Sequence, residues 1–320
     1  MSHSFDVFNG DADGICALIQ LRKAEPRDST LVTGVKRDIN LLSQVDAGTG
    51  DRVTALDISM DKNSTDLQRI LAEGAEVLYV DHHYPGDIPN HPQLRAVINE
   101  NADTCTSVLV NGLLKSAHID WAIAGAFGDN LHKTARALAA TTTLSDTDID
   151  ALEALGTYIN YNGYGPSLDD LHFDPADLYR RLYAAPSALA FIRDSEDFVQ
   201  LETGYQQDMA KAAALQPMHA SDSVAVFMLP NEAWARRVSG VYSNDLTTQF
   251  PDRAHAVLTV KDNGNYLVSV RAPLNNKQGA VDLCRQFPGG GGRAAAAGIN
   301  DLCAPDLQTF IDKFSEFYTN

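Results

Sequence analysis

Long apolar runs, paired cysteines and positive charge are the features that this sequence has least of. No stretch approaches the roughly 18–20 apolar residues that a membrane-spanning helix needs, so we expect no membrane partner. The N-terminus carries no basic region followed by an apolar one, so we expect no signal peptide and a cytoplasmic protein. The four cysteines form no Cys-x-x-Cys pair, which makes a zinc site built on cysteine a poor interpretation.

Positive charge is scarce: the sequence has 25 Lys and Arg residues and 42 Asp and Glu residues, which gives a net charge of −17. A field of that sign repels a long polyanion such as duplex DNA unless a basic groove overrides it. The charge is also uneven, since residues 221–320 hold nine basic and ten acidic residues and leave −16 on residues 1–220. We therefore expect cations to gather in the first part and phosphates in the second, with no long nucleic acid as partner.

The chain has 320 residues, of which 44% are hydrophobic and 21% charged, enough for two domains with ordinary cores. Residues 1–140 alternate short β-rich runs with helical stretches, which predicts an α/β fold with a mainly parallel sheet and helices on both faces. Residues 141–220 are predicted to be a helical linker, and residues 221–320 a smaller α/β domain. The predicted strands are Phe5–Phe8, Thr30–Val35, Arg52–Asp57, Glu76–Asp81, Leu94–Ile98, Val224–Leu229, His255–Val260 and Tyr266–Arg271.

Helical spacing of apolar residues predicts helices over Ile15–Ala24, about 63–73, 104–116 and 119–140. The one low-complexity tract is a glycine run, an arginine and an alanine run between Gly289 and Gly298. We expect the glycines to open a final helix.

Carboxylates and imidazoles follow the predicted strands of the first domain. Asp11 and Asp13 come after the first strand, Asp57 ends the third, and the fourth ends in Asp81–His83. The carboxyl ends of parallel strands meet at one sheet edge, so these side chains should converge there. Each aspartate alone is typical of a turn or a helix cap. Together they would repel unless cations bridge them, and oxygen-rich ligands with imidazole favour Mn²⁺ or Mg²⁺.

These motifs resemble those of the DHH phosphoesterase superfamily. Asp11-x-Asp13-Gly14, Asp57 and Asp81–His83 are similar to its first three motifs, and Gly125–Asp129 to its fourth, an aspartate on or near a helix. The superfamily includes RecJ-type exonucleases, nanoRNA-degrading oligoribonucleases, pAp phosphatases, and phosphodiesterases of linear and cyclic dinucleotides. The segment Asp103–Ser107 resembles the Ser/Thr-rich helix start between the third and fourth motifs.

The C-terminal part resembles the substrate-binding domain that accompanies this superfamily. Ser269–Arg271 is similar to its short strand motif, and Gly290–Gly298 to its Gly-Gly-Gly-His-x-x-Ala-Ala-Gly signature. Arg293 stands where the signature has histidine, and a guanidinium stays charged and can fork onto a phosphate. The substrate-binding residues that the resemblance implies are Arg271, Gly290, Gly291, Gly292 and Arg293, with the glycine N–H groups at a helix start.

The resemblance implies two metal ions, Mn²⁺ with Mg²⁺ as the alternative, bridged by Asp57. The implied ligands are Asn9, Asp11 and Asp57 for one ion, and Asp13, Asp57, His82 and Asp129 for the other. Among the catalytic residues, His83 would contact the scissile phosphate or protonate the leaving oxygen, and Asp81 would orient an imidazole. The sequence departs from the pattern at Val7, where many relatives carry histidine, and at Asn9, where RecJ-type proteins carry aspartate. The first ion should therefore bind weakly or exchange.

We expect metal-dependent hydrolysis of short linear oligoribonucleotides (nanoRNA), or of dinucleotides such as pGpG, to mononucleotides. A pAp phosphatase, a cyclic dinucleotide phosphodiesterase and a polyphosphatase are alternatives that differ mainly in the C-terminal pocket. The alternative of another class is an inactive nucleotide-binding sensor, favoured only by the departure at Val7. The sequence does not decide whether the chain forms an oligomer.

Overall fold

The computed structural model describes residues 2–319, which form two compact units divided between Gly204 and Tyr205. The first unit contains a five-stranded parallel sheet with the strand order β2-β1-β3-β4-β5. Every strand predicted for this part is present, although the second ends three residues early. The strands are β1 (Ser4–Phe8), β2 (Thr30–Val32), β3 (Arg52–Leu56), β4 (Glu76–Asp81) and β5 (Leu94–Ile98).

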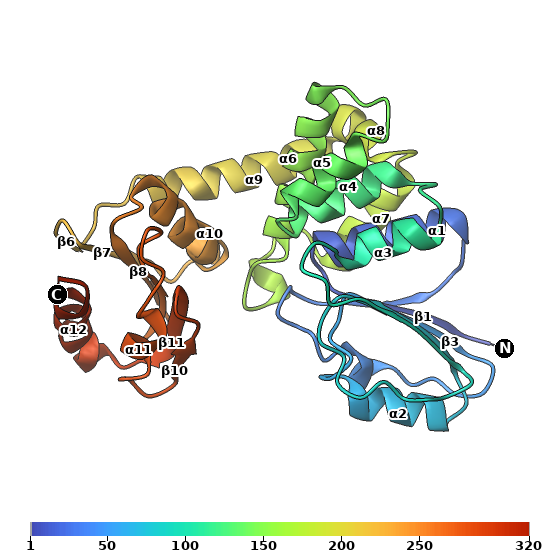
Figure 1. The fold of residues 1–320 in the computed structure, drawn as a ribbon, viewed down its shortest axis with the longest axis horizontal. Coiled ribbons are helices and arrows are strands. Elements are labelled where there is room, and N and C mark those ends of the chain that lie inside the picture. Colours follow the sequence, from blue (N-terminus) through green and yellow to red (C-terminus); the bar gives the residue numbers. More distant parts are fainter. Residues whose placement is uncertain (1, 320) are drawn as a thin grey trace. The chain divides into compact units, whose positions relative to one another are not determined.

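Helices cover both faces of this sheet, as the alternating pattern predicts. Figure 1 shows α1 (Ala12–Ala24) and α3 (Thr106–Leu113) over one face and α2 (Ser64–Ala72) over the other. Neighbouring strand residues point to opposite faces. Phe8 is therefore buried in the core that contains α1, whereas Val7 is buried in the core that contains α2.

The helices after residue 118 complete the first unit. They are α4 (Ile119–Gly128), α5 (His132–Ala139), α6 (Asp146–Asn162), α7 (Pro175–Ala184) and α8 (Ala188–Asp194). The helix predicted over 119–140 is divided, because Asn130 has a positive φ of 60° that a continuing helix cannot accommodate. Leu155, Leu178 and Phe191 are buried in the same core as α1. Most of the predicted linker 141–220 thus packs into the first unit, and the division lies within α9 (Glu196–Ala213).

The second unit contains a six-stranded mixed sheet with the order β10-β11-β9-β8-β7-β6. β7 and β8 are parallel, and the other neighbouring pairs are antiparallel. This matches the smaller α/β domain that the sequence predicts. Its strands are β6 (His219–Ala220), β7 (Val224–Leu229), β8 (Ala254–Val260), β9 (Tyr266–Arg271), β10 (Gly290–Gly292) and β11 (Ala296–Leu302), and its helices after α9 are α10 (Ala233–Gln249), α11 (Ala280–Cys284) and α12 (Leu307–Thr319).

The glycine and alanine tract forms a hairpin, so the prediction of a helix there was wrong. The glycines make edge strand β10, and the alanines begin β11, which pairs with both β10 and β9. Gly292 has a φ of 140°, a conformation that residues with a side chain rarely adopt. The helix preference of the alanines yields to sheet pairing, with Ala297 opposite Val270.

Short 3₁₀ turns occur at Leu41–Gln44, Leu168–Asp170 and Ala304–Asp306. Within residues 2–319, no helix combines the length and apolar content needed to cross a bilayer.

Candidate metal centre

The loop after β1 and the first turn of α1 place Asp11 and Asp13 at the carboxyl edge of the sheet. Asp11 caps α1, because its Oδ1 accepts hydrogen bonds from the backbone N–H groups of Asp13 and Gly14 at 3.0 and 3.1 Å. A Cβ at Gly14 would lie 2.3 Å from the carbonyl oxygen of Asn9, so this turn requires glycine. Both aspartates are buried.

Asp13 is held by the N-terminus of α3. Its two carboxylate oxygens accept hydrogen bonds from the backbone N–H groups of Thr106 and Ser107, each at 2.7 Å. The positive end of the helix dipole stabilises the negative charge of Asp13. The Thr106 hydroxyl also donates to Asp57 Oδ1 at 3.1 Å. The Ser/Thr-rich segment therefore joins two of the predicted metal ligands.

Asp57 follows β3 in an unusual backbone conformation. Its φ is 59°, in the left-handed region that few residues other than glycine adopt and that aspartate tolerates better than most. Its N–H still donates to the carbonyl of Val80 at 3.1 Å, so the residue stays tied to β4. Such strain at a buried polar residue is typical of functional sites.

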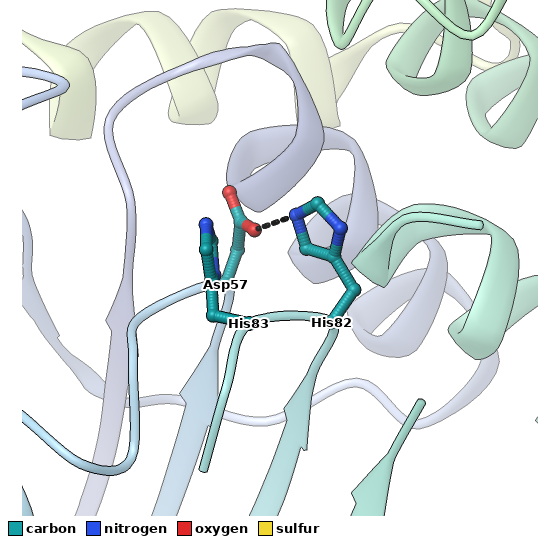
Figure 2. A group of neighbouring side chains, drawn as sticks. All are labelled: Asp57, His82 and His83. Atoms are coloured by element: carbon teal, nitrogen blue, oxygen red, sulfur yellow. Dashed lines mark ion pairs between the residues drawn. The ribbon is translucent and has the colours of Figure 1, made fainter. Parts of the chain in front are cut away.

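The side chain of His82 lies among the carboxylates. Its Nε2 is 3.4 Å from Asp57 Oδ1, 3.9 Å from Asp13 Oδ2 and 3.8 Å from Asp129 Oδ2. Figure 2 shows the contact with Asp57, with His83 on the other side of the carboxylate. Ligand atoms lie within 4.8 Å of one another in two overlapping groups, Asp57, His82, His83 and Asp13, His82, Asp129.

Asp129 reaches this cluster because α4 packs very closely against its neighbours. A Cβ at Gly128 would lie 2.3 Å from the Cβ of Ala12 in α1 and 2.8 Å from the carbonyl oxygen of Gly156 in α6. Only glycine fits at this crossing, and Asp129 follows it directly at the end of the helix. Gly128, within the fourth motif, thus positions the aspartate of that motif.

The cluster carries an electrostatic cost that a cation would relieve. Burial, followed by the charges of Asp13 and Asp11, raises the pKa of Asp57 well above its ordinary value. Burial and the same two neighbours raise the pKa of Asp129 to about 7. Three carboxylates and one imidazole are ligands that suit a hard or borderline divalent ion. We therefore expect such an ion to bind at Asp13, Asp57, His82 and Asp129.

His83 and Asp81 form a hydrogen-bonded pair beside the cluster. His83 Nδ1 lies 2.8 Å from Asp81 Oδ1, and this hydrogen bond raises the pKa of His83 against the opposing effect of burial. The imidazole that Asp81 orients is thus that of His83. Asp81 is fully buried, and within residues 2–319 its Oδ2 has no hydrogen-bond partner.

Lys36 is the residue of this site that the sequence analysis missed. Its Nζ lies 2.5 Å from Asp11 Oδ2 and 2.8 Å from Asn160 Oδ1. Burial opposes ionisation of Asp11, but the Lys36 ammonium holds the pKa of that carboxyl below its usual range. The signal was available, because Lys36 follows the predicted second strand just as the aspartates follow the others.

The second unit contains the predicted substrate-binding residues. Arg271 lines a hollow of about 290 Å³, together with Lys277. Its Nε donates to Asn244 Oδ1 at 2.8 Å, and one terminal nitrogen donates to the Ser269 hydroxyl at 2.9 Å. Arg293 is exposed after β10. Gly290, Gly291 and Gly292 lie on an edge strand and not at a helix start, so the predicted geometry of a glycine phosphate site there was wrong.

Comparisons with known proteins show which solved structures share this fold. No protein family and no curated protein matches the sequence. Among solved structures, exonuclease RecJ bound to manganese is 16% identical, with 99% of this chain and 90% of that chain covered at a TM-score of 0.65. The pGpG-specific phosphodiesterase PggH from Vibrio cholerae is 15% identical, with 98% and 97% covered at a TM-score of 0.58.

A third similar structure is the DHH domain of a member of the s1p family of ribosomal proteins. It is 14% identical, with 98% of this chain and 86% of that chain covered at a TM-score of 0.59. Similarity at such low identity establishes the fold alone. The chain has the fold of the DHH phosphoesterase superfamily, as the sequence motifs predict.

Proposed function

We propose that this protein is a metal-dependent phosphodiesterase that hydrolyses short linear oligoribonucleotides, or dinucleotides such as pGpG, to mononucleotides. The observation that carries the proposal is the cluster of Asp13, Asp57, His82 and Asp129 at the carboxyl edge of the parallel sheet. This edge is where ligands bind in open α/β folds.

The metal ligands in this proposal are the residues of that cluster. A divalent ion bound there supplies Lewis acidity, which lowers the pKa of a water molecule and neutralises charge on the phosphate. Oxygen ligands with one imidazole favour Mn²⁺, with Mg²⁺ as the alternative, and the similar RecJ structure is bound to manganese. The second ion that the sequence predicts, at Asn9, Asp11 and Asp57, stays a prediction.

His83 is the proton donor in this account. Its hydrogen bond with Asp81 raises its pKa, so a larger fraction of the imidazole is protonated near neutral pH. A protonated imidazole that is 44% exposed is accessible to a phosphate or to a leaving oxygen. Asp81 acts as a positioning residue that fixes the orientation of this ring.

A short substrate suits the rest of the molecule. The net charge of −17 disfavours a long polyanion, and PggH, named for pGpG, matches the chain over nearly the full length of both. In the second unit we propose that Arg271 binds a substrate phosphate in its hollow and that Arg293 and the backbone of Gly290–Gly292 add contacts.

Removing the arginines should weaken substrate binding more than turnover. For Arg271→Ala and Arg293→Ala we expect KM to rise about tenfold or more with kcat little changed, because a charge-assisted hydrogen bond contributes about 1.5–3 kcal/mol. Steady-state kinetics would measure this, with exposed Arg285→Ala as the control and circular dichroism as the check on folding. An unchanged KM for both variants would place the substrate elsewhere.

A substrate panel tests the function itself. The Mn²⁺-loaded protein would be incubated with equal concentrations of pGpG, a five-nucleotide RNA, pAp, a cyclic dinucleotide and polyphosphate. We expect mononucleotides to appear fastest from pGpG. Consumption of only pAp, cyclic dinucleotide or polyphosphate would reject the short linear substrate. Binding of pGpG without any hydrolysis would instead favour the nucleotide-binding sensor.

A further inference from the structure

A lysine ammonium lies against the carboxylate of Asp11, where the sequence predicts a metal ion. Lys36 Nζ contacts Asp11 Oδ2 at 2.5 Å, and its side chain is only 27% exposed. Three further contacts hold it there. Its backbone N–H donates to the carbonyl of Gly163 at 2.9 Å, its Nζ donates to Asn160 Oδ1 at 2.8 Å, and its Nζ lies 5.9 Å from the ring centroid of Tyr164. The ammonium is thus built into the site.

The carboxylates of Asp11 and Asp13 differ in the charge of the groups that donate hydrogen bonds to them. Asp11 Oδ1 accepts from two backbone N–H groups of its own helix, and its Oδ2 accepts from Lys36. Asp13 instead accepts hydrogen bonds from the backbone N–H groups of Thr106 and Ser107, which are neutral, and among the described residues it has no lysine or arginine partner. A neutral donor leaves the negative charge of a carboxylate for a metal ion, whereas an ammonium cancels it.

The other ligands predicted for the first ion are also weak. Val7, at the position where many relatives carry histidine, is fully buried in the apolar core against α2 and offers no ligand atom. Asn9 is neutral, and its amide nitrogen donates to the carbonyl of Lys36 at 3.3 Å. Among the described residues, neither group of neighbouring ligand atoms includes Asp11. The residues present therefore fit one ion well and do not fit the second.

We propose that the Lys36 ammonium replaces one of the two ions, so that the chain binds a single divalent cation at Asp13, Asp57, His82 and Asp129. This inference rests on the proposed metal dependence. The lysine supplies a fixed positive charge beside Asp11. A second cation on the same carboxylate would meet the repulsion of that charge at close range.

Metal counting tests this without reference to activity. Protein dialysed against Mn²⁺ would be analysed for bound manganese per chain and by electron paramagnetic resonance. Two Mn²⁺ ions about 3.5–4 Å apart, the spacing of two-metal sites, couple magnetically and give a spectrum that a single ion lacks. We expect one ion and no coupled spectrum for the wild type and for Lys36→Arg, which keeps the charge.

The neutral variant Lys36→Met should admit the second ion. We expect its manganese content to approach two per chain, with a coupled spectrum, because the Asp11 carboxylate loses its ammonium partner and becomes available to a cation. Lys62→Met is the matched control, since Lys62 is exposed and pairs with Asp61 outside the cluster, and it should still bind one ion. Circular dichroism would confirm that each variant folds.

Each outcome decides between the proposals. Two coupled ions in the wild type would overturn the role of Lys36 and leave the metal-dependent function standing. One ion in both the wild type and Lys36→Met would also overturn it, because Lys36 would not be what excludes the second ion. No bound manganese in the wild type would instead reject the proposed function.

Discussion

Replacing Asp57 with asparagine lowers kcat by at least about a thousandfold in this account. That loss exceeds the roughly 10–100-fold typical of residues that only orient metal ligands. Asp57 lies 3.4 Å from His82 Nε2 and accepts a hydrogen bond from Thr106, so it stands at the centre of the proposed ligand set. Asparagine keeps the shape and tolerates the φ of 59°, so the fold should be retained.

The same substitution should raise the melting temperature of the metal-free protein. Burial and the neighbouring carboxylates raise the pKa of Asp57, which means that its charge destabilises the folded state. Thermal unfolding and steady-state kinetics on one preparation would measure both effects, with exposed Asp87→Asn as the control. A kcat near that of the wild type would remove Asp57 from the catalytic centre. A lower melting temperature would mean that its charge stabilises the fold.

Removing the metal should abolish hydrolysis and change stability in a pH-dependent way. The pKa of Asp129 rises from 3.8 to about 7, with burial as the largest cause. Between those values the folded metal-free protein holds a proton that the unfolded chain releases. The stability of the metal-free protein therefore falls as pH rises through this window, and the cost is fully present above about pH 7. Mn²⁺ offsets this cost, but below pH 7 it must displace the proton.

Melting temperatures with and without Mn²⁺ at about pH 6 and 8 would test whether the metal-free protein loses stability as the pH rises. We expect the larger Mn²⁺-induced rise at the higher pH, and no turnover in protein treated with EDTA. The EDTA-treated sample reloaded with Mn²⁺ is the control. Full turnover in EDTA, or an equal rise at both pH values, would contradict the proposed metal centre.

The residues at the strand ends could be predicted because their placement depends on local pattern and on one rule of parallel sheets. Asp13, Asp57 and His82 follow recognisable strands, and such strands end at a common edge. The pairing of Lys36 with Asp11 was harder to foresee. It joins two loops whose register depends on how β2 pairs with β1, and an isolated lysine after a strand is usually a solvated residue.

Long-range packing explains where the fold departs from prediction. The alanines after Gly292 favour a helix locally, but the sheet gains a strand when they pair with β9. Residues 141–200 show helical periodicity that does not reveal which core they join, and Leu155 and Phe191 bury in the first unit. The positive φ of Asp57 likewise arises from its tertiary surroundings.

The most direct test of the central claim is hydrolysis of pGpG by the Mn²⁺-loaded protein in ¹⁸O-labelled water, with mass spectrometry of the products. Attack of water on the bridging phosphorus breaks its bond to the 3′ oxygen and puts one solvent oxygen on the new 5′-phosphate. We expect half of the released GMP to carry a single ¹⁸O atom. Intact pGpG after full metal loading, or a cyclic phosphate without solvent oxygen, would contradict it.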